Sequence, residues 1–155
     1  MSIELIQPDS VETWRQARAL VEQYAASLGV DLSFQNFNHE LDHLADEYSP
    51  PQGAFLLAVE ESRSLGCVGL RQHAPDIGEI KRLFIAPAAR GRGLGRLLAE
   101  AVVAAGRQRG YRQLLLDTLP SMNQAHALYA SMGFRPTAPY RYNPVPGTAY
   151  LELNL

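Results

Sequence analysis

A glycine-rich turn between an apolar strand pattern and a helix pattern restricts the fold of this chain more than any other sequence feature. Residues 79–85 are typical of a strand, the segment Arg90–Gly95 contains three glycines, and apolar residues recur at helical spacing from Leu94 onward. Glycines at a helix start let backbone N–H groups approach an anion, and the helix dipole adds about half a positive charge there. The arginines in or beside the turn are Arg90, Arg92 and Arg96. Because guanidinium groups suit phosphate oxygens, the segment predicts a pyrophosphate-binding loop between a strand and a helix.

The periodic segments on either side extend this unit to an α+β fold. Strand patterns cover residues 3–7, 54–60, 65–72, 79–85, 114–116 and 149–153, another strand begins at Phe134, and helix patterns cover residues 11–28, 33–47, 94–110 and 121–132. Short turns between consecutive strands favour antiparallel hairpins, whereas the uninterrupted Leu114–Leu116 is typical of a buried strand parallel to its neighbour. We expect a mixed, mainly antiparallel sheet of about six or seven strands, flanked by about four helices.

Composition excludes several classes of partner. The chain of 155 residues is long enough for one domain, and its net charge of -2 argues against a nucleic-acid partner, because such proteins need a basic surplus. The first residues lack the basic and long apolar regions of a signal peptide. The longest apolar stretch, residues 99–105, is too short to cross a bilayer, and Cys67 is the only cysteine. These features predict a cytoplasmic protein with no membrane span.

The order of the glycines distinguishes among phosphate-binding loops. Gly91, Gly93 and Arg96 break the G-x-G-x-x-G pattern of dinucleotide sites, and no G-x-x-x-x-G-K-[ST] occurs. Arg90-x-x-Gly93-x-Gly95 instead resembles the [QR]-x-x-G-x-[GA] motif of the GNAT superfamily of N-acetyltransferases, which binds the pyrophosphate of coenzyme A. The superfamily's last helix carries the pattern A-x-x-L-Y-x-x-x-G-F, which is similar to Ala125-x-x-Leu128-Tyr129-x-x-x-Gly133-Phe134.

The resemblance implies a fold, an activity and a co-substrate. It implies a single GNAT N-acetyltransferase domain over residues 1–155 that moves an acetyl group from acetyl-CoA directly to a primary amine, without a metal. The expected acceptor is a small molecule or an amino acid, in preference to the terminus of a protein. The chain could act as a monomer or a homodimer.

Residues expected to contact coenzyme A follow from the same motif. They are Leu83, Phe84, Ile85, Arg90, Gly91, Arg92, Gly93, Leu94, Gly95 and Arg96. In the superfamily, backbone groups of the strand before the loop bind the pantetheine arm and polarise the thioester carbonyl. Many members also carry an asparagine where this chain has Met122. Asn123 comes one residue late, which rotates a helical side chain by about 100°, so its contact with coenzyme A is left open.

Two residues are candidates for proton transfer. Glu79 lies six residues before Ile85, the position of a catalytic glutamate in some members, and could accept the proton of the amine. The alternative is a structural carboxylate paired with Lys81. Tyr129 occupies the superfamily's tyrosine position and could protonate the departing thiolate, the alternative being a core tyrosine.

The acceptor-binding residues are less defined. In the superfamily, the first two helices and the loops between the last strands select the acceptor, which here means residues 31–35 and 140–143. We single out Ser33, Gln35 and Arg141, the last because an arginine between two tyrosines could hold a substrate carboxylate.

Two other functions fit parts of the sequence. His39-Glu40-Leu41-Asp42-His43 matches the H-E-x-x-H pattern of zinc hydrolases, although the charged Asp42 is unusual there and a solvated helix face is the ordinary explanation. A GNAT fold that binds coenzyme A without turnover, as a regulatory or interaction module, would show ligand affinity but no thiol release.

Overall fold

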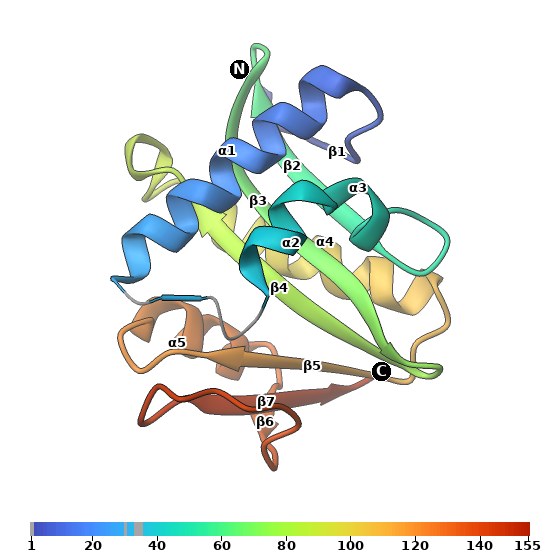
Figure 1. Cartoon of the computed structure of the whole chain (residues 1–155), viewed down its shortest axis with the longest axis vertical. Helices are drawn as coiled ribbons and strands as arrows, with labels where there is room; N and C mark the ends of the chain where they lie inside the picture. Colours follow the sequence, from blue (N-terminus) through green and yellow to red (C-terminus); the bar gives the residue numbers. More distant parts are fainter. Residues whose placement is uncertain (1, 30, 33–35) are drawn as a thin grey trace.

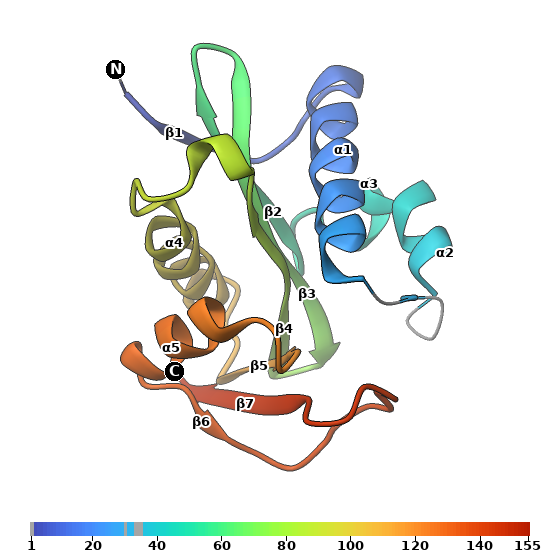
Figure 2. The ribbon, with the colours of Figure 1, turned by 90° about the vertical axis from the view of Figure 1, so that its left-hand side faces the viewer.

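The chain forms one seven-stranded sheet with helices on both faces (Figures 1 and 2). The computed structural model describes residues 2–29, 31–32 and 36–155. The strands are β1 (Glu4–Ile6), β2 (Ala54–Glu60), β3 (Arg63–Ala74), β4 (Ile77–Ile85), β5 (Gln113–Thr118), β6 (Arg135–Pro136) and β7 (Ala149–Asn154). They lie in the order β1-β2-β3-β4-β5-β7-β6, and only β4 and β5 pair in parallel. The predicted mixed, mainly antiparallel α+β fold is confirmed.

The helices divide between the two faces of the sheet. They are α1 (Val11–Leu28), α2 (Phe37–Asp42), α3 (Leu44–Glu47), α4 (Leu94–Gln108) and α5 (Asn123–Ser131), with a 3-10 turn at Pro87–Ala89. Figure 2 shows α1, α2 and α3 on one face and α4 and α5 on the other. Each face has its own apolar core, with Leu98 and Leu114 on the α4 side and Val21 and Phe55 on the α1 side. Among the described residues, no helix is both long and apolar enough to cross a membrane.

Two predicted helix boundaries need correction. The helix expected over residues 33–47 is divided at His43 into α2 and α3, and its first residues, 33–35, lie outside the described part of the chain. The last helix was expected to begin at residue 121, but Met122 occupies the N-cap and makes no side-chain cap hydrogen bond. The Met122 N–H donates to Leu119 O and closes a turn there, so α5 begins only at Asn123.

The start and the end of α1 follow the sequence. Ser10 accepts a hydrogen bond from the Thr13 backbone in a capping box, and Gly29 ends the helix with φ 68. This placement matters for function because the last turns of α1 bring Tyr24 and Leu28 to the place where β4 and β5 separate.

The sheet opens between β4 and β5. The two strands pair only from Ile77 with Gln113 to Glu79 with Leu115. Farther along, β4 stays with β3 and carries one extra residue, because Gly69 pairs with Lys81 whereas Cys67 pairs with Phe84. Arg82 lies in this bulge with φ 64, while β5 continues beside β7. The bulge and the loss of pairing leave space between the carboxyl ends of the two parallel strands.

Candidate active site

A cleft of about 790 Å³ opens where β4, the glycine-rich turn and the start of α5 meet. It is lined by eight of the predicted coenzyme A residues: Leu83, Phe84, Ile85, Arg90, Gly91, Gly93, Leu94 and Gly95. Its opposite wall comes from the end of α1 and from the segment Ser121–Ala125. Met122 and Asn123 both belong to this wall, so the asparagine that is displaced by one residue still faces the cleft.

The turn holds its backbone in conformations that suit an anion. Gly91 has φ 83 and Gly93, the N-cap of α4, has φ 78. Nothing lies within 4 Å of where a Cβ would stand on either residue, so both glycines have open space beside them. The first N–H groups of a helix have no partner within the helix, and the start of α4 borders a cleft that could admit a phosphate. The residues therefore fit the pyrophosphate of coenzyme A.

The three arginines of the turn differ in their surroundings. Arg90 lines the cleft and donates through Nε to Ile85 O at 3.2 Å. Arg92 forms a bidentate pair with Glu60, with N···O distances of 3.1 and 2.7 Å, and lies outside the lining. Arg96 also lies outside it and donates to Ser131 Oγ at 2.7 Å.

A second, small cavity of about 30 Å³ lies in the space between β4 and β5. It shares five lining residues with the cleft: Tyr24, Leu28, Leu83, Met122 and Ala125. Farther in it is lined by Lys81, Asp117, Thr118, Tyr129 and Asn143. The Thr118 hydroxyl is buried and has no hydrogen-bond partner among the described residues. The cleft thus continues into a narrow polar cavity.

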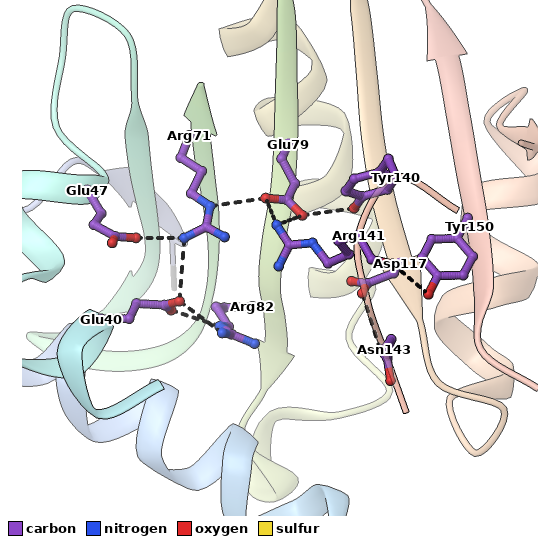
Figure 3. Close-up of polar contacts among 10 residues, drawn as sticks. All are labelled: Glu40, Glu47, Arg71, Glu79, Arg82, Asp117, Tyr140, Arg141, Asn143 and Tyr150. Atoms are coloured by element: carbon purple, nitrogen blue, oxygen red, sulfur yellow. Dashed lines mark hydrogen bonds and ion pairs between the residues drawn. The ribbon is translucent and has the colours of Figure 1, made fainter. Parts of the chain in front are cut away.

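The buried Glu79 lies at the centre of a network of charged side chains on the α1 face of the sheet (Figure 3). Its carboxylate accepts from Arg71 Nε at 3.0 Å, from Arg141 Nη2 at 2.7 Å and from the Tyr140 hydroxyl at 2.8 Å. Arg71 also pairs with Glu47 at 2.7 Å. The network joins α3, β3, β4 and the loop before β7.

The charges around Glu79 determine its protonation. Burial favours the neutral acid, but Lys81, Arg141, Arg71 and the Tyr140 hydrogen bond outweigh burial, so the pKa of Glu79 lies below its ordinary value. Its surroundings therefore differ from the single pairing with Lys81 that was considered as the alternative to catalysis. The role of Glu79 as a base stays a prediction.

Lys81 is the residue that sequence reasoning undervalued. It is 5% exposed and lines the small cavity. Burial and then the charge of Arg82 lower the pKa of Lys81 to about 7, although Glu79 acts in the opposite direction. The signal was present in the sequence, because Lys81 is the only lysine of the chain.

Tyr129, a residue of α5, also lines the small cavity. It is 4% exposed, and its ring packs against Phe134 with centroids 5.2 Å apart. Burial raises the pKa of its phenol above the ordinary value. A position at the cavity suits the predicted proton donor, and packing against Phe134 suits a core residue, so the role in catalysis stays a prediction.

The residues of the zinc pattern are engaged in other contacts. Glu40 is buried and pairs with Arg82 through two hydrogen bonds of 2.8 and 2.9 Å. Burial opposes ionisation of Glu40, but Arg82 outweighs it and the pKa lies below its ordinary value. His39 and His43 stack with centroids 4.1 Å apart. In the described part of the chain, no group of three His, Cys, Asp or Glu side chains is placed to hold a metal.

A third cavity, which is polar and has a volume of about 430 Å³, also borders Glu79. Its lining includes Arg71, His73, Glu79 and Arg141. Among the described residues, Arg141 Nε is one of the buried polar atoms without a hydrogen-bond partner. The role of Arg141 in acceptor binding stays a prediction, and Ser33 and Gln35 lie outside the described residues.

A glycine-rich turn beside a cleft that leads into the space between two separating parallel strands is the arrangement expected of an acyl-CoA-dependent acyltransferase. Over residues 15–134 the chain matches the acetyltransferase (GNAT) family, and it belongs to that family. It is 39% identical over 140 residues to an uncharacterised N-acetyltransferase of Schizosaccharomyces pombe, covering 89% of this chain and 86% of the relative. It is 33% identical over 135 residues to the IAA acetyltransferase of Azospirillum brasilense, covering 86% of each.

The fold is also found among solved structures. An acetyltransferase of the GNAT family from Staphylococcus aureus superposes with a TM-score of 0.81, at 18% identity and with 99% of both chains covered. At this identity the likeness concerns the fold alone.

Proposed function

We propose that the chain transfers an acetyl group from acetyl-CoA directly to a primary amine of a small molecule or an amino acid. The family is one of acetyltransferases, and its co-substrate is acetyl-CoA. The observation that supports this reaction in this chain is the continuity of the glycine-lined cleft with the small cavity through their five shared residues. The cofactor would bind in the cleft, and its thioester would meet the acceptor amine at the small cavity. Residues 1–155 would act as one domain.

Different groups of the chain would bind the cofactor and transfer the protons. The N-terminus of α4 and Arg90 would hold the pyrophosphate, and the free edge of β4 around Leu83 would bind the pantetheine arm. A backbone N–H there could stabilise the oxyanion, an effect often worth about 3 kcal/mol. Tyr129 would protonate the departing thiolate, and a basic group on the α1 face would take the amine proton. Glu79 was predicted for that last role.

The acceptor is proposed to carry an anionic group near its amine. Members of the family acetylate small amines or amino acids. Arg141 and Arg71 line the polar cavity beside Glu79, and the buried Arg141 Nε lacks an acceptor within the residues the structure describes. A substrate carboxylate would supply that acceptor.

The test is thiol release from acetyl-CoA with a panel of amino acids and their decarboxylated amines. We expect turnover with at least one amine, a lower KM for the carboxylated partner, and loss of that preference in Arg141→Gln. Binding of acetyl-CoA without thiol release on any amine would instead support the non-catalytic module. Location in the cytoplasm and a monomeric or dimeric state stay predictions.

A further inference from the structure

The only lysine of the chain, Lys81, lies on the same strand as Glu79 and lines the small cavity between β4 and β5. All other Lys or Arg positions are arginine, including those that pair with Glu40 and Glu79. An arginine is always protonated in proteins, whereas a buried lysine can lose its proton. Among the lysine and arginine positions, the one able to lose its proton near neutral pH is thus the one in this cavity.

The geometry of β4 determines where this amine points. Glu79 is the last residue of β4 that pairs with β5, and Lys81 is the next residue on the same face of the strand. On this face of β4, Lys81 is therefore the first side chain beyond the point where the two strands separate. It lines the small cavity together with Leu83, which borders the cleft, and with Tyr129.

We propose that Lys81, and not Glu79, accepts the proton of the acceptor amine, and that Glu79 is a positioning residue that holds Arg71 and Arg141. This inference rests on the proposed acetyl transfer and names the proton acceptor within it.

The expected proton affinities separate the two candidates. A primary amine has a pKa of about 8 to 10. Glu79 is a poor acceptor for this proton, because the charges around it hold its pKa below its ordinary value and three donors already occupy its carboxylate. Transfer to Lys81, with a pKa of about 7, is unfavourable by about ten- to a thousandfold, which is the range in which general bases act at neutral pH.

The charged and titratable groups around Lys81 come from several elements. Those that line its cavity or act on its charge are Glu79 and Arg82 of β4, Arg71 of β3, Asp117 of β5, Tyr24 of α1, Tyr129 of α5 and Arg141 of the loop before β7. Arg82, Arg71 and Arg141 favour the neutral amine, and Glu79 favours the ammonium. Burial is the largest cause of the shift.

The acceptor enters as an ammonium and gives one proton to neutral Lys81 Nζ. The resulting amine nitrogen forms a bond to the thioester carbonyl carbon. The C–S bond then breaks, its electron pair goes to sulfur, and the thiolate takes a proton from the Tyr129 phenol. The nitrogen gives its second proton to the Tyr129 oxygen, which restores the phenol. Lys81 releases its proton to solvent, so one amide, one thiol and one proton are formed per turnover.

The first experiment measures the lysine directly and does not depend on activity. In protein labelled with ¹³C at the lysine ε-carbon, the single lysine gives a single signal. We expect a titration midpoint within about one pH unit of 7, because the pKa of Lys81 is lowered to about 7. The matched control is Arg63→Lys, which adds an exposed lysine at the β2–β3 turn. This lysine should give a second signal whose titration midpoint lies near pH 10.4. A Lys81 midpoint near that of the control would overturn the proposal.

The second experiment compares variants in thiol release. Lys81→Met and Lys81→Arg should lower kcat/KM by about 10²- to 10⁴-fold and remove the rising limb near pH 7 from the profile of kcat/KM against pH. Their affinity for acetyl-CoA should stay within about twofold of the wild type. Glu79→Gln should keep the limb and move it to lower pH, because the charge of Glu79 raises the pKa of Lys81.

The outcomes separate the two proposals. If Lys81→Met keeps kcat/KM within tenfold while Glu79→Gln loses it, Glu79 is the base and the inference is wrong, although the acetyl transfer stands. If the wild type releases no thiol with any amine while the lysine titrates near pH 7, the proposed function fails and the role of Lys81 fails with it.

Discussion

The two sides of the site are built by different means. On the proposed cofactor side, backbone conformation shapes the cleft: Gly93, the N-cap of α4, has a positive φ, and the exposed Arg90 is the arginine in the lining. On the proposed acceptor side, charged side chains pair with one another: the buried Glu40 and Arg82 form one pair, and the buried Glu79 pairs with the half-buried Arg71 and Arg141. The first side should respond to mutation mainly in affinity, and the second mainly in stability and pH dependence.

The largest effect should come from breaking the buried pair between α2 and β4. Glu40→Gln leaves the Arg82 guanidinium buried beside a neutral amide, and removing one partner of such a pair costs about 3–5 kcal/mol of unfolding free energy. Urea denaturation measures it. The control is Glu12→Gln, which breaks an exposed pair with Arg15 and should leave the midpoint unchanged within error. A loss below about 1 kcal/mol for Glu40→Gln would mean that the pair does not hold α2 to the sheet.

The next effect is the dependence of stability on pH. Lys81 has a folded pKa of about 7, below the value of about 10.4 expected in the unfolded chain. Between these values the unfolded state binds more protons, so unfolding free energy should rise with pH above 7, by up to about 1.4 kcal/mol per pH unit. Lys81→Met should remove this rise. Urea denaturation at pH 7, 8 and 9 checks it, and parallel curves for the two proteins would contradict the buried, neutral lysine.

The contrast between the two sides also explains what the sequence could predict. The cofactor side is contiguous: the turn and the start of α4 lie within Arg90–Gly95, and glycine positions report backbone conformation directly. The acceptor side brings together Glu40, Arg71, Glu79 and Arg141, which are distant in sequence and meet only through sheet register and loop placement. Periodicity could place Glu79 and Lys81 on one face of a strand. It could not show that two arginines would donate hydrogen bonds to the Glu79 carboxylate.

A smaller effect should separate backbone strain from cofactor binding. Gly93→Ala forces alanine to φ 78, with no steric clash within 4 Å, at a cost of about 1–2 kcal/mol. Gly110→Ala is the matched control, since Gly110 has φ 83 and equally open surroundings but lies outside the cleft. Both variants should lose similar stability, and only Gly93→Ala should weaken acetyl-CoA binding, by about three- to tenfold. Equal affinities in calorimetric titration would show that the N-cap conformation is not needed for the cofactor.

The smallest effect compares two arginines of the same turn. Arg90 lines the cleft, whereas Arg92 is held by Glu60 outside it. Arg90→Gln should therefore weaken acetyl-CoA binding by about three- to tenfold, an effect that shrinks at high salt because the contact is exposed, and Arg92→Gln should change affinity less than twofold. Titration at two salt concentrations measures both. The reverse order would mean that Arg92 leaves Glu60 when the cofactor binds, and that side-chain rearrangement contributes to cofactor binding along with backbone conformation.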